Sequence, residues 1–369
     1  MRVVVTHPTH QHAYETAAAA QRSRMLERFV TGIYRRDTRR WHPGIDPARV
    51  TSLPAHDVAS ALAARTIGAR VDHIGWMLRG FDAAAARRIS RWPSDAVHAF
   101  EGAALATLGA ARREGRLAVL DVPSAHERFA EAAALEGDSA TRFPTERIRA
   151  ERAQADLMLA PSEFVKSCLV EHGAPEERVA IVPYGADPVA YEPARPGGEG
   201  FHVAFVGEIG RRKGVAHLLD AWRRLRLPGA RLTLAGRVAD PSLVRDLPAG
   251  ARWSGVLTRE RVRQLMSGSH AFAFPSLAEG SALVTYEAMA AGLPSVVTPE
   301  SGSPVRDGAD GFVVPRRDAT ALAECLEALA EDPGLRERMG ASARERIEQG
   351  YTWDHYRRRL VAAWEGARA

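Results

Sequence analysis

The stretch 270–298 constrains the fold of this chain more than any other part of its sequence. His270 to Phe274 alternates apolar and small residues, which is typical of a buried strand. A helix rich in Ala, Leu, Met and Glu is predicted to begin at Glu279, because these residues favour helix. Gly292 and Pro294 end that helix, and Ser295 to Thr298 forms the next strand. A strand, a helix and a second strand in this order predict an α/β fold.

The start of the predicted helix has the properties of an anion site. A helix that follows a strand presents unpaired N–H groups and the positive end of its dipole. Gly280, Ser281 and Ala282 are small, so a phosphate can approach their backbone closely. Glu279 and Glu287 would lie roughly 12 Å apart along the helix axis, so that one meets a sugar and the other a ribose. The alternative is one Glu that complements the helix dipole and a second on a solvated face.

The motif PS-x-x-EG-x-x-LV-x-x-EAMA-x-G-x-P-x-V in this stretch resembles the donor-site signature of the retaining glycosyltransferases of family 4. The resemblance places the family's E-x7-E pair on Glu279 and Glu287, with Glu279 on the sugar as a catalytic residue and Glu287 on the ribose. It also places the diphosphate on the backbone of Gly280 to Leu283, so that Leu283 joins the substrate-binding set. Where the family has EGFGL, Ser281 replaces the aromatic residue and Ala282 the second glycine.

A glycine-bounded basic loop, Gly207 to Gly214, follows the predicted strand Phe201 to Val206. It lacks the GK[ST] ending of a P-loop. It is similar to the family loop in which a lysine before a glycine, here Lys213, holds the donor diphosphate and stabilises its charge. The family often carries an arginine directly after the first glycine. Glu208 stands there in this chain, which leaves Arg211 or Arg212 to supply the missing cation.

Two histidines of the N-terminal half are candidates for the site. His10 lies in the loop after the first predicted strand, Arg2 to Val5, and ligands of doubly wound sheets gather at the carboxyl ends of strands. For His10 we favour polar contacts with acceptor or phosphate over a metal site shared with neighbouring histidines. His126 follows the predicted strand Arg116 to Val122. The resemblance places His126 beside the transferred sugar as a catalytic residue; the alternative is a surface histidine at a helix start.

The resemblance also implies the domain organisation. It predicts an α/β protein of GT-B architecture, with two doubly wound Rossmann-like domains that face a central cleft. The Pro- and Gly-rich segment Glu192 to Gly200 is the predicted linker. Residues 1–192 would form the acceptor-side domain, together with a C-terminal helix at about 351–369 that crosses back to it. Residues 193–350 would bind the nucleotide sugar, with Val256 and Leu257 near the base.

The remaining elements follow from periodicity and capping residues. Ser162 and Thr258 are predicted helix N-caps. Cys168 and Cys325 are expected to be free thiols in a reducing compartment. We also predict helices over Ala13–Arg28, 55–95 and Glu101–Glu114, and strands over Phe29–Tyr34 and Asp95–Phe100.

The amino-acid composition limits the classes of binding partner that we expect. The chain has 369 residues and a hydrophobic fraction of 46%, which suits two soluble domains. Its formal net charge of +5 fits a small anionic ligand, an anionic membrane surface or no specific partner. It has no aromatic-interleaved basic motif, so nucleic acid is not an expected partner. The basic run Arg35 to Arg40 is either a solvated loop or a peripheral contact with an anionic membrane. No apolar run approaches the roughly 18 residues of a membrane span, and we expect a cytoplasmic protein.

The predicted function is retaining transfer of a sugar from a nucleotide-diphosphate sugar to an unidentified glycan, lipid-linked or small-molecule acceptor. The resemblance implies that the donor is a co-substrate and that neither a cofactor nor a divalent metal is required. The alternatives are another GT-B enzyme, such as a sugar-nucleotide epimerase or a phosphorylase, and a non-catalytic scaffold. Glu208 and Ser281 are the features that favour the scaffold. A nicotinamide dehydrogenase is disfavoured because no G-x-G-x-x-G follows a strand.

Overall fold

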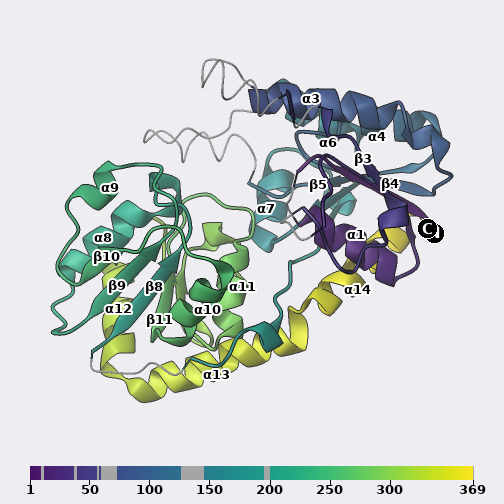
Figure 1. Cartoon of the computed structure of the whole chain (residues 1–369). Helices are drawn as coiled ribbons and strands as arrows, with labels where there is room; N and C mark the ends of the chain where they lie inside the picture. Colours follow the sequence, from purple (N-terminus) through teal and green to yellow (C-terminus); the bar gives the residue numbers. More distant parts are fainter. Residues whose placement is uncertain are drawn as a thin grey trace.

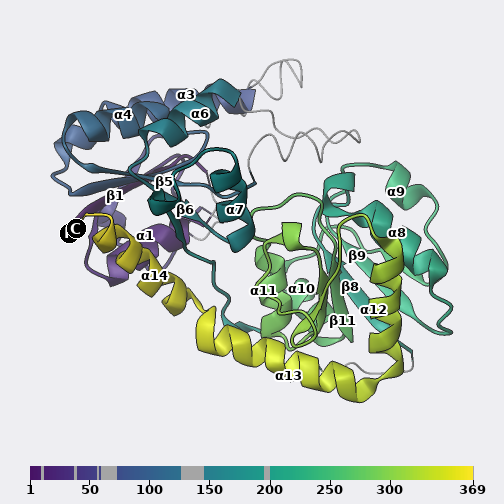
Figure 2. The ribbon, with the colours of Figure 1, turned by 180° about the vertical axis from the view of Figure 1, so that it is seen from behind.

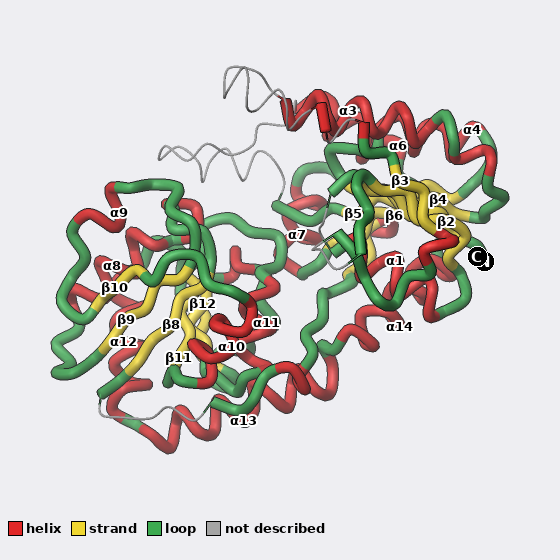
Figure 3. The backbone as a smooth tube through the Cα atoms, in the orientation of Figure 1, coloured by secondary structure: helices red, strands yellow, loops and turns green. Residues whose placement is uncertain are grey.

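The computed structural model describes residues 1–9, 12–36, 40–55, 58–59, 73–125, 145–194 and 200–368. These residues form two domains, and each domain is a parallel sheet between two layers of helices (Figures 1 and 3). The predicted pair of Rossmann-like α/β domains is confirmed. The mostly buried, apolar strands suit this arrangement, because a parallel sheet is buried on both faces.

The first domain contains a seven-stranded sheet with the order β3-β2-β1-β4-β5-β6-β7. Helix α1 lies on one face, and α3, α4, α6 and α7 lie on the other (Figure 1). The strands are β1 (Val3–His7), β2 (Leu26–Thr31), β3 (Val50–Ser52), β4 (Ala96–Phe100), β5 (Leu117–Asp121), β6 (Leu157–Ala160) and β7 (Val179–Ile181). The helices are α1 (Ala13–Arg22), α3 (His73–Ala86), α4 (Leu105–Arg113), α6 (Thr145–Gln154) and α7 (Glu163–Glu171), with short 3₁₀ turns η1 (Pro47–Arg49), η3 (Ile89–Arg91), η4 (Glu176–Arg178) and η5 (Pro188–Ala190).

The second domain contains a six-stranded sheet with the order β10-β9-β8-β11-β12-β13. The strands are β8 (His202–Val206), β9 (Arg231–Ala235), β10 (Ala251–Trp253), β11 (Ala271–Phe274), β12 (Ser295–Val297) and β13 (Gly311–Val313). The helices are α8 (Val215–Arg224), α9 (Ser242–Arg245), α10 (Arg259–Ser267), α11 (Leu283–Ala290), α12 (Ala319–Glu331) and α13 (Pro333–Gly350), with 3₁₀ turns η6 (Arg211–Lys213) and η7 (Pro299–Ser301).

The last helix, α14 (Trp353–Gly366), returns to the first domain and packs against α1, as predicted (Figure 2). The Tyr356 hydroxyl lies 2.7 Å from Thr16 Oγ1 of α1. Where the chain crosses between domains, the Ala186 N–H donates to the Tyr351 carbonyl at 2.9 Å, so the two crossings run side by side. The domains are therefore joined by two adjacent segments of chain.

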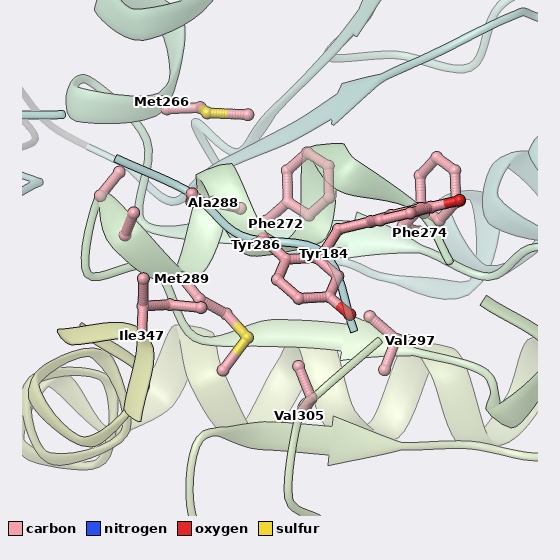
Figure 4. Close-up of a cluster of buried hydrophobic side chains, with 14 of the residues drawn as sticks. Tyr184, Met266, Phe272, Phe274, Tyr286, Ala288, Met289, Val297, Val305 and Ile347 are labelled. Atoms are coloured by element: carbon pink, nitrogen blue, oxygen red, sulfur yellow. The ribbon is translucent and has the colours of Figure 1, made fainter. Parts of the chain in front are cut away.

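A core of large apolar side chains holds β11 and α11 together (Figure 4). Phe272 and Phe274 of β11 and Tyr286 and Met289 of α11 are all nearly fully buried. Full burial of one such side chain stabilises the fold by about 1.5–3 kcal/mol. The short loop between the strand and the helix is thereby fixed at both ends.

Several predicted boundaries were wrong for local reasons. Helix α1 ends at Arg22 instead of Arg28, because Arg24 adopts a left-handed conformation with φ of 59° and begins the turn into β2. Helix α4 begins at Leu105, four residues later than predicted, and α3 ends at Ala86. The edge strand β3 was not predicted. By contrast, the Ser162 side chain does cap its helix, by accepting the Val165 N–H.

Candidate functional site

The predicted donor loop lies between β11 and α11, but α11 begins later than expected. The helix starts at Leu283 with Ala282 as N-cap, so Glu279 precedes it. The Glu279 N–H donates to the Glu300 carbonyl and the Ala282 N–H to the Ser301 carbonyl, each at 3.0 Å. These bonds hold the loop extended against η7. The predicted spacing along a helix axis from Glu279 to the second glutamate is therefore wrong, and the Ala282 amide is already engaged.

Three of the predicted residues meet at one point. Glu279 Oε2 contacts Lys213 Nζ and lies 3.2 Å from Arg212 Nη1. The same guanidinium nitrogen donates to the Ala278 carbonyl at 2.9 Å. The two cations come from η6, which follows β8, and the carboxylate follows the neighbouring strand β11. The single negative charge of the carboxylate offsets part of the positive charge of the two cations.

The lack of a side chain at Gly214 lets η6 approach the loop that follows β11. Gly214 has φ of 72°, and a Cβ there would lie 1.8 Å from the Pro275 carbonyl oxygen. A larger residue would push η6 away from the chain that leaves β11. The Leu277 N–H donates to the Arg212 carbonyl at 2.8 Å and locks the contact. The motif KG therefore matters for its glycine as well as its lysine.

The Lys213 ammonium has an unusual environment. Burial, together with the neighbouring Arg212 guanidinium, lowers the pKa of Lys213 to about 7, and Glu208 acts in the opposite direction. The Nζ atom lies 5.3 Å from the centre of the Phe274 ring, which forms an apolar wall beside it. A partly desolvated lysine next to a second cation gains strongly from an anionic partner. Glu279 is that partner in this structure.

The structure decides between the two cations that the sequence left open. Arg211 pairs with Asp240 at 3.0 Å and points away from Glu279, whereas Arg212 faces it. Glu208, the charge reversal after the first glycine, forms an ion pair with Arg237 at the end of β9. Its negative charge is thus matched by an adjacent arginine.

The second acidic residue of the motif belongs to a different network. Glu287 is half-buried on α11 and accepts a hydrogen bond from the phenol of Tyr191, the residue directly before the predicted linker. Burial raises the pKa of Glu287, while Tyr191 and the nearby Arg259 and Arg263 oppose that rise. The Arg263 guanidinium carbon lies 5.6 Å from the centre of the Tyr191 ring. Glu287 is thereby oriented from the linker side of α11.

The residues predicted near the base lie at the carboxyl end of β10. Val256 is 70% exposed and Leu257 is half-buried. The preceding Gly255 accepts the Gly236 N–H at 2.9 Å, which ties this turn to the end of β9. The position fits the edge at which ligands of parallel sheets bind. His10 and His126 lie outside the described residues.

Sequence reasoning missed a buried cluster in the first domain. Asp121, the last residue of β5, accepts a hydrogen bond from His12 Nε2 at 2.9 Å and lies 3.3 Å from His98 Nε2. Burial acts to raise the pKa of Asp121, but the two histidines hold it below its ordinary value. Burial lowers the pKa of His98. The sequence features that could have indicated this cluster were Asp121 at the end of a predicted strand and His12 at the start of a predicted helix. Among the described residues, no group of three or more His, Cys, Asp or Glu is arranged to hold a metal ion.

Comparison with known proteins agrees with this geometry. The family model "Glycosyl transferases group 1" matches residues 193–346, and the model "Glycosyltransferase Family 4" matches residues 55–189. Both models describe glycosyltransferases, and each one matches a different domain of the chain. The chain is 32% identical over 211 residues to the alpha-maltose-1-phosphate synthase of Mycolicibacterium smegmatis, covering 48% of this chain and 54% of that protein.

A second relative is the D-inositol 3-phosphate glycosyltransferase of Streptomyces bingchenggensis. It is 31% identical over 256 residues, with coverage of 60% of this chain and 56% of that protein. The chain thus spans about half the length of the curated relatives it matches. Among solved structures, it is similar to sucrose-phosphate synthase of Thermosynechococcus elongatus, with a TM-score of 0.76, 16% identity and coverage of 99% and 98% of the two chains.

The fold is also similar to that of the Anabaena protein HepE, solved with UDP-glucose, with a TM-score of 0.70, 17% identity and coverage of 99% and 100%. These structures establish the GT-B fold of the chain. None of the described helices has the length and apolar character needed to cross a bilayer.

Proposed function

We propose that this protein transfers a sugar, with retention of anomeric configuration, from a nucleotide-diphosphate sugar to an acceptor that is still to be identified. The observation that carries the proposal is the convergence of Lys213 and Arg212 on Glu279 beside the N-terminus of α11. Two cations held by one movable carboxylate form a site that can exchange that carboxylate for a diphosphate. Relatives named as glycosyltransferases support the same class of reaction.

The donor would replace Glu279 as the partner of the two cations. Lys213 and Arg212, with the Ser281 and Leu283 N–H groups, would stabilise the charge that develops on the leaving diphosphate. In this proposal the protein's own cations and amides do this work, and the nucleotide sugar is the co-substrate. Ala282 contributes no amide donor, because its N–H is bonded to Ser301.

The released Glu279 would then accept hydrogen bonds from sugar hydroxyls. A carboxylate has two oxygens and can hold two hydroxyl donors of a diol at once. Glu287 would accept the ribose hydroxyls while Tyr191 keeps it oriented. Val256 and Leu257 would flank the base, and the acceptor would enter from the first domain, where His10 and His126 are candidates for contact.

A panel of nucleotide sugars tests the proposal. Thermal shifts with UDP-, GDP-, ADP- and TDP-linked sugars should identify one base, and the same donor should release its nucleoside diphosphate on incubation. Nuclear magnetic resonance of the product should show the anomeric configuration of the donor. An isomerised donor sugar would instead indicate an epimerase. The absence of any nucleotide binding by calorimetry would indicate a non-catalytic scaffold and would overturn the proposal.

A further inference from the structure

A buried contact joins the two domains beside the donor loop. Ser162 is the N-cap of α7, on the side of the first domain that faces the second (Figures 1 and 2). Its hydroxyl donates to the Gly280 carbonyl of the second domain at 2.6 Å. The same oxygen accepts the Val165 N–H at 3.2 Å. The Ser162 hydroxyl therefore donates its single proton to a bond between the domains and accepts, through a lone pair, a bond within its own helix.

Backbone of both domains approaches the Gly280 peptide closely. A Cβ at Gly280 would lie 1.7 Å from the carbonyl oxygen of Pro123, which follows β5 of the first domain. On its other side, a Cβ at Gly302 would lie 2.1 Å from the Gly280 oxygen and 2.9 Å from Ser162 Oγ. Gly302 has φ of 60°, a conformation that favours glycine. Backbone from both domains thus encloses one peptide.

The residue next to that peptide is Glu279. Its N–H is bonded to Glu300, and its carboxylate faces the two cations of η6. On the other side, Ser281 Oγ donates to the Gly302 carbonyl at 3.1 Å. A displacement of the Gly280 peptide would therefore be passed directly to Glu279. Misplacement of a catalytic group by about 1 Å can cost about 100-fold in rate.

We propose that Ser162 is a positioning residue, whose hydrogen bond to Gly280 holds the first domain against the donor loop and sets Glu279 for turnover. This inference rests on the proposed function of the site. Ser162 touches neither Lys213 nor Arg212, so it acts on the position of Glu279 and not on the charge that binds the diphosphate. Turnover should therefore depend on Ser162, and nucleotide affinity should not.

Three substitutions separate this role from the capping role. Ser162→Thr keeps both the donor and the cap, and its turnover should stay within about 3-fold of wild type. Ser162→Ala loses both, and Ser162→Asp keeps the cap but has no proton for the Gly280 carbonyl. Both should lose about 10- to 100-fold in turnover of the donor found in the panel, with affinity for the nucleoside diphosphate of that donor changed by less than about 2-fold. The matched control is Asp318→Ala, which removes the cap of α12 inside the second domain and should lower Tm without lowering turnover.

Amide hydrogen exchange tests the contact between Ser162 and Gly280 in the absence of a nucleotide sugar. Exchange of the amides at 279–282 should be about 10-fold faster in Ser162→Ala and Ser162→Asp than in wild type, and unchanged in Asp318→Ala. Wild-type turnover in Ser162→Asp, or unchanged exchange in both variants, would overturn the proposal. If wild-type protein turns over no nucleotide sugar, the proposed function is wrong, and the exchange result alone decides whether Ser162 holds the loop.

Discussion

Two carboxylates, one in each domain, have similar positions and different surroundings. Asp121 ends β5 and Glu279 follows β11, and each faces two basic side chains. The partners of Asp121 are histidines and its side chain is 6% exposed, whereas the partners of Glu279 are an arginine and a lysine and its side chain is 21% exposed. The first cluster is sealed and the second is open to solvent.

This difference fits a structural role for the Asp121 cluster and the proposed binding role for the Glu279 cluster. A buried histidine can lose its charge, as the lowered pKa of His98 indicates, so the Asp121 cluster can be satisfied without a ligand. The guanidinium of Arg212 keeps its charge, and Lys213 is charged while it faces an anion. Removing Glu279 from these cations leaves positive charge for another anion to bind. The comparison therefore predicts that mutations in the two clusters affect different quantities.

The largest expected effect is the loss of stability in Asp121→Ala. The substitution leaves His12 without its buried acceptor, and breaking a buried pair in this way costs about 3–5 kcal/mol. Urea unfolding should show this loss in the free energy of unfolding. Glu279→Ala serves as the comparison and should cost about 1 kcal/mol or less, because its site is partly solvated. Equal losses of unfolding free energy in Asp121→Ala and Glu279→Ala would contradict the difference between the two clusters.

The next largest effect is the loss of turnover in Lys213→Ala. Removing one group that stabilises charge on a leaving diphosphate should lower kcat by about 100- to 1000-fold. Arg211→Ala is the matched control, since Arg211 pairs with Asp240, and its kcat should stay within about 2-fold of wild type. Donor turnover with purified variants measures both. Similar losses in the two would show that general positive charge, and not the Glu279 contact, matters.

Glu279→Ala should show opposite effects on binding and turnover. Without its competing carboxylate, Lys213 and Arg212 are left for the diphosphate, so calorimetry should give UDP affinity equal to or tighter than that of wild type. Turnover should fall by about 10- to 100-fold, because the sugar loses its acceptor of hydrogen bonds. A variant that binds UDP much more weakly and keeps its turnover would reverse the assigned roles.

The smallest effect is a pH dependence of UDP affinity. The lowered pKa of Lys213, about 7, means that the ammonium form that binds an anion is lost as pH rises through that value. UDP affinity should therefore be highest below pH 7 and decline by a few-fold to about 10-fold toward pH 9. In Lys213→Arg the charge persists over this range, and the dependence should flatten. A rise in wild-type affinity with increasing pH would contradict the predicted direction of this dependence.

The residues that meet at the proposed donor site could be named from the sequence because they lie in contiguous motifs. Glu279, Lys213 and the KG glycine come from two short stretches whose residue types report their chemistry directly. Arg212 could not be chosen over Arg211 from sequence, because the choice depends on how η6 turns against β11. The late start of α11 was also missed, since the bonds from the loop to Glu300 and Ser301 are tertiary.

The Asp121 cluster and the Ser162 contact could not be predicted for a related reason. His12 and Asp121 are separated by 109 positions, and Ser162 and Gly280 by 118. Each residue has an ordinary local explanation as a strand end, a helix start, a cap or a turn. Only the strand order of the first sheet and the contact between domains bring them together. The fold itself was predictable because the alternation of apolar strands and helices runs through both halves.

The central claim is that the loop before α11 and the cations of η6 bind the diphosphate of a sugar donor. A crystal structure with the nucleotide sugar that gives the largest thermal shift tests it most directly. The account predicts phosphate oxygens within hydrogen-bond distance of Lys213 Nζ, the Arg212 guanidinium and the Ser281 and Leu283 N–H groups, with Glu279 on the sugar. A diphosphate bound elsewhere, with Glu279 still paired to Lys213, would contradict it.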